Sequence, residues 1–188
     1  MPNRPASLFS AGPLALIGLI AAVALTRLIP HPPNFSPVEA MALFGGAYLA
    51  NRSWAVLVPL IALFISDLAL GLLMGGEYFQ YFVSAGFLLV YLTIAVLSVL
   101  GFGLRGKVSV ARVAGYGVAG SILFFLTTNF GVWLGSAFYP QTASGLMAAY
   151  AAGVPFLQNG ILGTLFYSVL LFGTYELLKQ RIPALAQG

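Results

Sequence analysis

The sequence has no cysteine and a single histidine, His31. The first absence excludes disulfides, thiolate metal sites and a cysteine nucleophile, and the second excludes zinc motifs built on paired histidines. A phosphate-binding loop of the Gly-x-x-x-x-Gly-Lys type is also absent, so any coupling to ATP requires another chain. We therefore expect this chain to bind no metal and no cofactor, and not to be an enzyme.

Charge is equally scarce, because only 6% of the 188 residues are charged, against about a quarter in soluble domains. The few basic residues are scattered through loops and form no basic face, so nucleic acid is not an expected partner. Hydrophobic residues make up 60% of the chain, and they show no sustained alternation of the kind that a membrane barrel requires. Composition predicts one all-α integral membrane domain over residues 1–188.

Six apolar segments are candidates for membrane spans, each of which needs about 20 residues to cross roughly 30 Å of hydrocarbon. They cover approximately residues 12–29, 37–50, 54–74, 81–100, 110–137 and 156–178. The second is short and needs tilting or bilayer thinning to cross. Residues 144–153 are predicted to form a short interfacial helix. The first segment carries no small-residue cleavage site, which favours its retention as a span.

The basic residues are distributed unevenly between the two sets of segment ends. Seven of the eight lie at one set, and they are Arg4, Arg52, Arg105, Lys107, Arg112, Lys179 and Arg181. Only Arg27 lies near the other set. Because Lys and Arg are retained on the cytoplasmic side, this bias predicts cytoplasmic termini and a multi-pass protein of the bacterial plasma membrane. The unusual polar residues then gather at the outer face.

A proline-rich loop, residues 30–37, joins the first two segments and contains His31. Its prolines favour extended or turn geometry and make the loop stiff. His31 can contact a ligand or a metal, although the sequence offers it no obvious partner ligands. Ser36 and Glu39 match a capping box at the start of the second segment, so we interpret Glu39 as a cap.

Asp67 lies inside the third segment, about two helical turns from its outer end. A carboxylate at membrane depth costs several kcal/mol unless it is paired, hydrated or protonated, and such residues commonly mark functional sites. One interpretation is that Asp67 contacts a ligand. The other is that Asp67 ties helices together, either as a cap or by pairing with Arg27. The two overlap, because Arg27 can orient Asp67 towards a ligand.

Two further clusters of polar residues lie near the predicted outer ends. Asn129 and Trp133 are four residues apart and share a helix face, where an amide and an indole can bind a flat heterocycle. The alternative is an interhelical hydrogen bond from Asn129 and an interfacial position for Trp133. Gln158 and Asn159 follow Pro155 at the start of the sixth segment, where either can cap a helix.

Small residues recur on the first segment as Ala11, Ala15, Gly18 and Ala22. Such a series lets helices approach closely in lipid. It serves either packing inside the bundle or docking of a partner membrane protein, and the spacing alone does not choose between these.

Four stretches together resemble an uncharacterised bacterial family of six-span membrane proteins described as transport proteins. They are Pro30–Pro37, Ser66–Leu68, Thr128–Leu134 and Gly153–Phe156, and the resemblance extends over roughly residues 12–178. It implies a cysteine near Ala149 and an acid near Thr164 in many relatives, and this chain has neither.

The layout is also similar to the S components of energy-coupling-factor vitamin transporters. That similarity implies six helices with cytoplasmic termini and a vitamin site beneath the outer loops, near His31, Asn34, Asp67, Asn129 and Trp133. It also implies docking onto a separate ATPase-driven module through small residues of the first helix.

The leading functional hypothesis is a substrate-binding membrane subunit, or a small transporter, for uptake of a small vitamin-like molecule. Apolar walls with a few placed polar groups suit such a ligand, with Asp67 and Asn129 orienting its polar edges and Trp133 stacking on it. A non-catalytic scaffold or assembly subunit is the alternative. An intramembrane enzyme is the third hypothesis, but it needs a nucleophile–base pair or a metal cluster that we do not find in the sequence.

Overall fold

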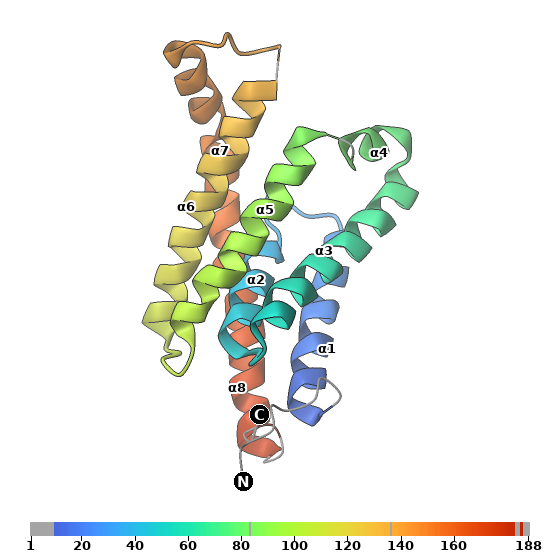
Figure 1. Ribbon diagram of the computed structural model, residues 1–188, viewed down its shortest axis with the longest axis vertical. Coiled ribbons are helices and arrows are strands. Elements are labelled where there is room, and N and C mark those ends of the chain that lie inside the picture. The colour runs from blue at the N-terminus through green and yellow to red at the C-terminus, as the bar shows by residue number, and fades with distance from the viewer. Residues whose placement is uncertain (1–9, 83, 136, 183–184, 186–188) are drawn as a thin grey trace.

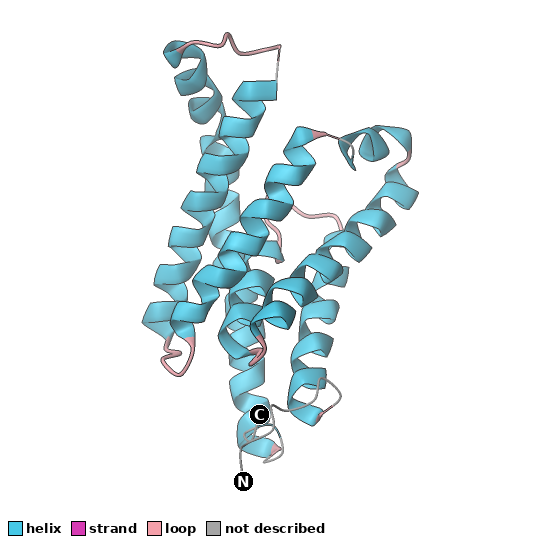
Figure 2. Ribbon diagram, in the orientation of Figure 1, coloured by secondary structure: helices cyan, strands magenta, loops and turns pink. Residues whose placement is uncertain are grey.

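The computed structural model describes residues 10–182 and 185, apart from 83 and 136, and all regular structure in this part of the chain is helical (Figure 2). The elements are α1 Ala11–Leu25, η1 Thr26–Leu28, α2 Val38–Tyr48, α3 Arg52–Met74, α4 Gly76–Phe82, α5 Ala85–Leu100, η2 Gly101–Leu104, α6 Val110–Gly135, α7 Ala143–Ser168, the π-helical turn η3 Val169–Gly173 and α8 Thr174–Arg181. The prediction of an all-α fold is confirmed over these residues.

The long helices run up and down the same axis, so that α1 begins and α8 ends at one end of the bundle (Figure 1). The start of α3 and the connection between α5 and α6 lie at the same end. This arrangement brings together six of the seven basic residues that the sequence grouped, and the seventh, Arg4, lies outside the described residues. Arg27 follows α1 and is separated from the others by the length of that helix.

Five stretches of helix are long and apolar enough to cross a membrane. They are Ala11–Leu28, Arg52–Met74, Gly86–Leu104, Val110–Gly135 and Ala143–Arg181. The second predicted span corresponds to α2, which has 11 residues and, at 1.5 Å per residue, is only roughly 16 Å long. The predicted count of six spans is therefore not confirmed, because α2 covers about half of a hydrocarbon thickness of roughly 30 Å.

Two predicted boundaries are wrong. The segment expected at 81–100 is divided: α4 ends at Phe82, and α5 begins after Ser84, whose hydroxyl caps the Phe87 amide at 3.1 Å. The interfacial helix expected at 144–153 is the first part of α7, which passes through Pro155 without ending. A proline removes one backbone hydrogen bond, and a long apolar helix tolerates that loss when its neighbours pack around it.

The short helix α2 lies in the centre of the bundle, where it contacts α1, α3, α5, α6 and α7. Every residue from Val38 to Ala47 is buried. Two glycines allow the close approach: a Cβ added to Gly45 would lie 2.8 Å from Cγ of Pro59, and one added to Gly46 would lie 2.1 Å from the carbonyl oxygen of Ser98. Backbones in direct contact are typical of small residues in membrane helix pairs.

The carboxyl end of α2 is capped by Arg105 from the connection between η2 and α6. Its guanidinium donates to the carbonyl oxygens of Gly46 at 2.9 Å, Leu49 at 2.8 Å and Ala50 at 3.2 Å. The last carbonyls of a helix lack partners inside it and carry partial negative charge, so a cation satisfies both needs. This cap ends α2 near the connection between α5 and α6, and residues of its amino end, Val38 and Glu39, line a cavity.

Candidate functional site

A cavity of about 560 Å³ lies between the end of α1, the connection before α2, and helices α3 to α7. Its volume is within the range of small-molecule sites, roughly 300–1,000 Å³. Five of the six residues predicted to bind substrate line it: Arg27, His31, Asn34, Asp67 and Asn129. Residues more than a hundred positions apart in the sequence thus meet at one place.

Trp133, the sixth predicted residue, lies outside the lining of this cavity. Its indole nitrogen donates to the carbonyl oxygen of Pro140 at 2.9 Å, and its ring contacts Phe130 with centroids 5.4 Å apart. The structure therefore does not bring Trp133 to the cavity that Asn129 lines. A four-residue spacing fixes the helix face but not the direction of a long side chain, and the connection to α7 draws the indole away.

Asn129 lies on the cavity wall, and among the described residues it does not make the interhelical bond that was its alternative role. Its side-chain nitrogen donates to the carbonyl oxygen of Phe125, one turn earlier in α6, at 3.0 Å. A Cβ added to Gly153 of α7 would lie 2.4 Å from Oδ1 of Asn129, so glycine at that position makes room for the amide. The amide oxygen lies where α6 and α7 meet at the cavity.

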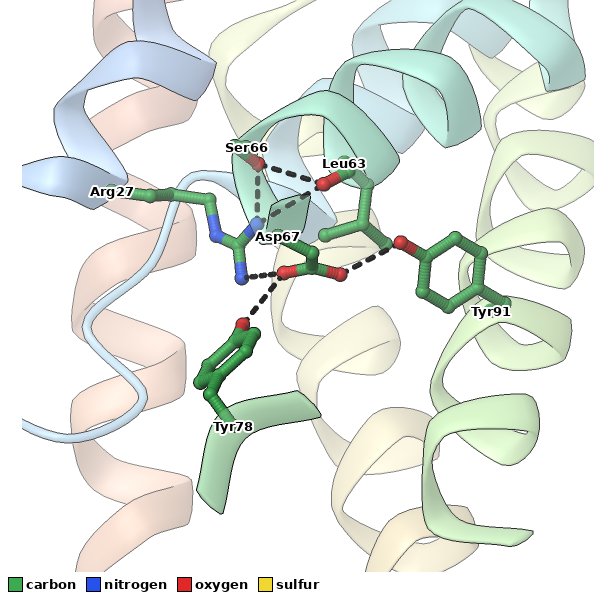
Figure 3. A network of polar contacts seen from close by, with 6 residues as sticks. All are labelled: Arg27, Leu63, Ser66, Asp67, Tyr78 and Tyr91. Atoms are coloured by element: carbon green, nitrogen blue, oxygen red, sulfur yellow. Dashed lines mark hydrogen bonds and ion pairs between the residues drawn. The ribbon is translucent and has the colours of Figure 1, made fainter. Parts of the chain in front are cut away.

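Asp67 is paired with Arg27 in a buried polar network (Figure 3). The guanidinium of Arg27 lies 2.6 Å from Oδ1 of Asp67, and the two side chains are 13% and 4% exposed. Tyr78 of α4 donates to Oδ1 at 2.9 Å, and Tyr91 of α5 donates to Oδ2 at 2.7 Å. Arg27 also donates to the hydroxyl of Ser66. Both carboxylate oxygens are engaged by the protein itself.

This network connects four elements through one carboxylate, since Arg27 follows α1, Asp67 lies in α3, and the two tyrosines come from α4 and α5. The pairing of Arg27 with Asp67 that the sequence suggested is thus present. Because a buried carboxylate with three donors is already satisfied, Asp67 shapes the cavity wall as a structural tie. Only the fold, which brings α4 and α5 next to Asp67, reveals the role of the two tyrosines.

The connection before α2 is a folded turn that α7 supports. The amide of Phe35 donates to the carbonyl oxygen of Pro32 at 3.0 Å, and Asn34 has a φ of 62°, a conformation that asparagine adopts more readily than most residues. The side chain of Asn159 donates to the carbonyl oxygen of Pro33 at 3.0 Å. The suggestion that Asn159 caps a helix start is therefore wrong, because Asn159 lies inside α7 and fastens the connection.

Glu39 is buried and does not cap α2, so the capping-box interpretation is wrong. The helix begins after Pro37, without a side-chain cap. The carboxylate turns into the bundle, where Thr164 of α7 donates to Oε2 at 2.7 Å and Ser121 of α6 donates to the same oxygen. Because α2 is short and buried, its first turn lies among other helices. A carboxylate there destabilises the folded protein unless it accepts hydrogen bonds.

Two polar side chains near the start of α2, Ser36 and Glu39, also lie on the cavity wall. Glu39, 7% exposed, lines the cavity, and so does Ser36, whose hydroxyl oxygen is buried without a hydrogen-bond partner among the described residues. Sequence reasoning missed both. The signal was present, because an acid inside a predicted span is a candidate site by the same rule that selected Asp67. The spacing of Ser36 and Glu39 also matched a capping box, and that local explanation was preferred to a functional site.

The small-residue series of α1 faces away from the bundle. Ala11, Gly18 and Ala22 are exposed and Ala15 is half-buried, whereas the buried face of α1 carries residues such as Leu16 and Ile20. A Cβ added to Gly18 would meet no atom within 4 Å. The series is therefore not used for packing inside this bundle.

The chain belongs to a family of unknown function, DUF6580, whose model matches residues 9–185. Neither the curated proteins nor the solved structures contain a match to the sequence. Family membership therefore covers nearly the whole chain but assigns no substrate, partner or activity, and function has to be inferred from the chemistry of the cavity.

Proposed function

We propose that this chain is a substrate-binding membrane subunit, or a small transporter, for uptake of a small vitamin-like molecule across the bacterial plasma membrane. The cavity of about 560 Å³ is the observation that carries the proposal. It combines apolar and aromatic walls, including Phe124, Tyr139 and Phe156, with a few polar side chains. Binding sites for small organic molecules have this composition, in which the polar groups orient the ligand.

The distribution of basic residues supports capture from outside. Retention of Lys and Arg on the cytoplasmic side would place the start of α1 and the end of α8 inside, and the cavity at the opposite, outer part of the bundle. Capture there and release inward then require movement of the helices or of a partner protein. The resemblance to S components of vitamin transporters suggests the second of these.

Ligand capture can be tested with a variant whose larger side chain fills the cavity while all of its polar groups remain. Ala152 is exposed on α7 and lines the cavity, and its neighbour Ala151 is exposed but lies outside the lining. We expect Ala152→Trp to reduce the amount of co-purifying small molecule at least tenfold, because the indole occupies the ligand's space. Ala151→Trp, the matched control, should bind as the wild type does.

Native mass spectrometry of protein purified from cells in rich medium measures this directly. Stoichiometric ligand in the wild type and in Ala151→Trp, and its loss in Ala152→Trp, is the expected pattern. Wild-type protein that carries no ligand and gains no thermal stability from a panel of vitamins would contradict capture and favour a scaffold.

The proposal includes a separate ATPase-driven module that docks on the exposed small-residue series of α1. We expect Gly18→Leu to be at least as stable as the wild type, because the position faces open space and leucine favours a helix over glycine by roughly 0.5–1 kcal/mol. The same change should remove co-purifying ATPase activity. Leu88→Phe, at an exposed position of α5, is the control and should retain it. ATPase activity that is absent from the wild type, or equal in Gly18→Leu, would contradict docking at this face.

A further inference from the structure

The charges on the cavity wall do not balance. Three described residues of the lining carry formal charges: Arg27, Asp67 and Glu39. Arg27 and Asp67 neutralise each other in the network of Figure 3. Glu39 forms no ion pair within the described part of the chain. The cavity therefore has one carboxylate in excess, and that carboxylate is 7% exposed.

The bonds that Glu39 makes leave part of its carboxyl group unused. Ser121 and Thr164 both bind Oε2. Among the described residues no hydrogen bond reaches Oε1, and a Cβ added to Gly160 of α7 would lie 3.7 Å from that oxygen. Glu39 and Gly160 also line a small hollow beside the main cavity. A carboxylate removed from water without a cation is costly, so an incoming positive charge gains more there than at an exposed site.

A second observation on the same wall points to a ligand. The hydroxyl of Ser36 is buried without a partner among the described residues, and it lies three positions before Glu39. Buried hydroxyls normally form hydrogen bonds, so an unsatisfied one on a cavity wall marks a place where a bound molecule can supply the partner. Together, the free carboxylate oxygen and the hydroxyl can receive a group with several N–H donors.

We propose that the molecule captured in this cavity carries a positively charged nitrogen group, such as an amidinium or a protonated aminoheterocycle, that pairs with Glu39. This inference rests on the proposed function and names the class of its substrate. Planar cations of this kind bind a carboxylate through paired N–H bonds, and the aromatic side chains Phe124, Tyr139 and Phe156 suit their flat apolar part. Asp67 is not available for the same role, because Arg27 and two tyrosines occupy it.

The experiment compares three probes of the same shape and different charge: benzamidine, a cation; benzamide, which is neutral; and benzoate, an anion. Binding to the full chain in lipid nanodiscs is measured by isothermal titration calorimetry. We expect benzamidine to bind at least tenfold more tightly than benzamide, and benzoate to bind most weakly. Because this comparison uses the wild-type chain, it does not depend on whether any variant folds.

Two variants then locate the charge. Glu39→Gln should remove the preference for benzamidine, whereas Glu176→Gln should retain it, because Glu176 makes the same change of net charge on α8, outside this cavity. The thermal unfolding of each variant without a probe shows whether it is folded. Equal binding of the three probes, a preference for benzoate, or a preference for benzamidine that survives in folded Glu39→Gln would overturn the assignment.

The experiments distinguish failure of the charge assignment from failure of ligand capture. If the wild type carries a ligand that Ala152→Trp loses, but shows no preference for benzamidine, capture stands and the charge assignment fails. If the wild type carries no ligand and none of the three probes binds, both fail.

Discussion

Replacing Asp67 with Asn is expected to destabilise the protein by about 3–5 kcal/mol, because it removes the charge that compensates a buried Arg27. The guanidinium is 13% exposed and would keep its charge without a carboxylate opposite it. The amide also offers one acceptor oxygen in place of two, so either Tyr78 or Tyr91 loses its hydrogen bond to this side chain. The measurement is the free energy of unfolding in mixed micelles, with the melting temperature as a second readout.

The control for this prediction removes both charges. In Arg27→Met with Asp67→Leu no unpaired charge remains, and buried ion pairs replaced by apolar residues of similar size are often neutral in stability. The double variant should therefore recover a large part of the loss, although the two tyrosine hydroxyls lose their bonds to Asp67. If Asp67→Asn alone stayed within about 0.5 kcal/mol of the wild type, the network would not be a structural tie.

The long apolar helices and the Arg27–Asp67 pair could be predicted because each leaves a signal within the sequence itself. An apolar run of about 20 residues has few alternatives to a membrane helix, and a carboxylate inside it needs a partner. Arg27 was the only basic residue expected near the same level. The gathering of Arg27, His31, Asn34, Asp67 and Asn129 on one cavity followed from the predicted topology.

The role of Glu39 could not be predicted, because it depends on where α2 lies and not on its own neighbours in the sequence. Ser36 and Glu39 have the spacing of a capping box, which is a local explanation for both residues. In the folded chain α2 is surrounded by five helices, so its first turn meets Ser121 and Thr164 instead of solvent. The fold decides between a cap and a buried site, and spacing alone does not.

The continuity of α7 was missed for a related reason. Pro155 is a strong local reason to end a helix, and the sequence was divided there. The structure continues through it because α7 packs closely against α6 and supports the connection before α2 through Asn159. Contacts with neighbouring elements outweigh the loss of one backbone bond.

Gly46→Ala is expected to destabilise the protein by about 3 kcal/mol or more, at the upper end of the cost of overpacking. The added methyl group would lie 2.1 Å from the carbonyl oxygen of Ser98 and 2.9 Å from Cα of Gly101. Both are backbone atoms of the α5–η2 segment, so no side-chain rotation relieves the clash. The two helices must separate, and α2 must then lose contacts on its other sides. The free energy of unfolding and the yield of folded protein measure the effect.

The matched control is Gly115→Ala in α6, where an added Cβ would meet no atom within 4 Å. Alanine favours a helix over glycine by roughly 0.5–1 kcal/mol, so this variant should be slightly more stable than the wild type. The two substitutions are chemically identical and differ only in what the methyl group touches. Equal stability of the two variants would mean that α2 and α5 are not in backbone contact. The central position of α2 and the burial of Glu39 would then both need revision, because the same packing produces them.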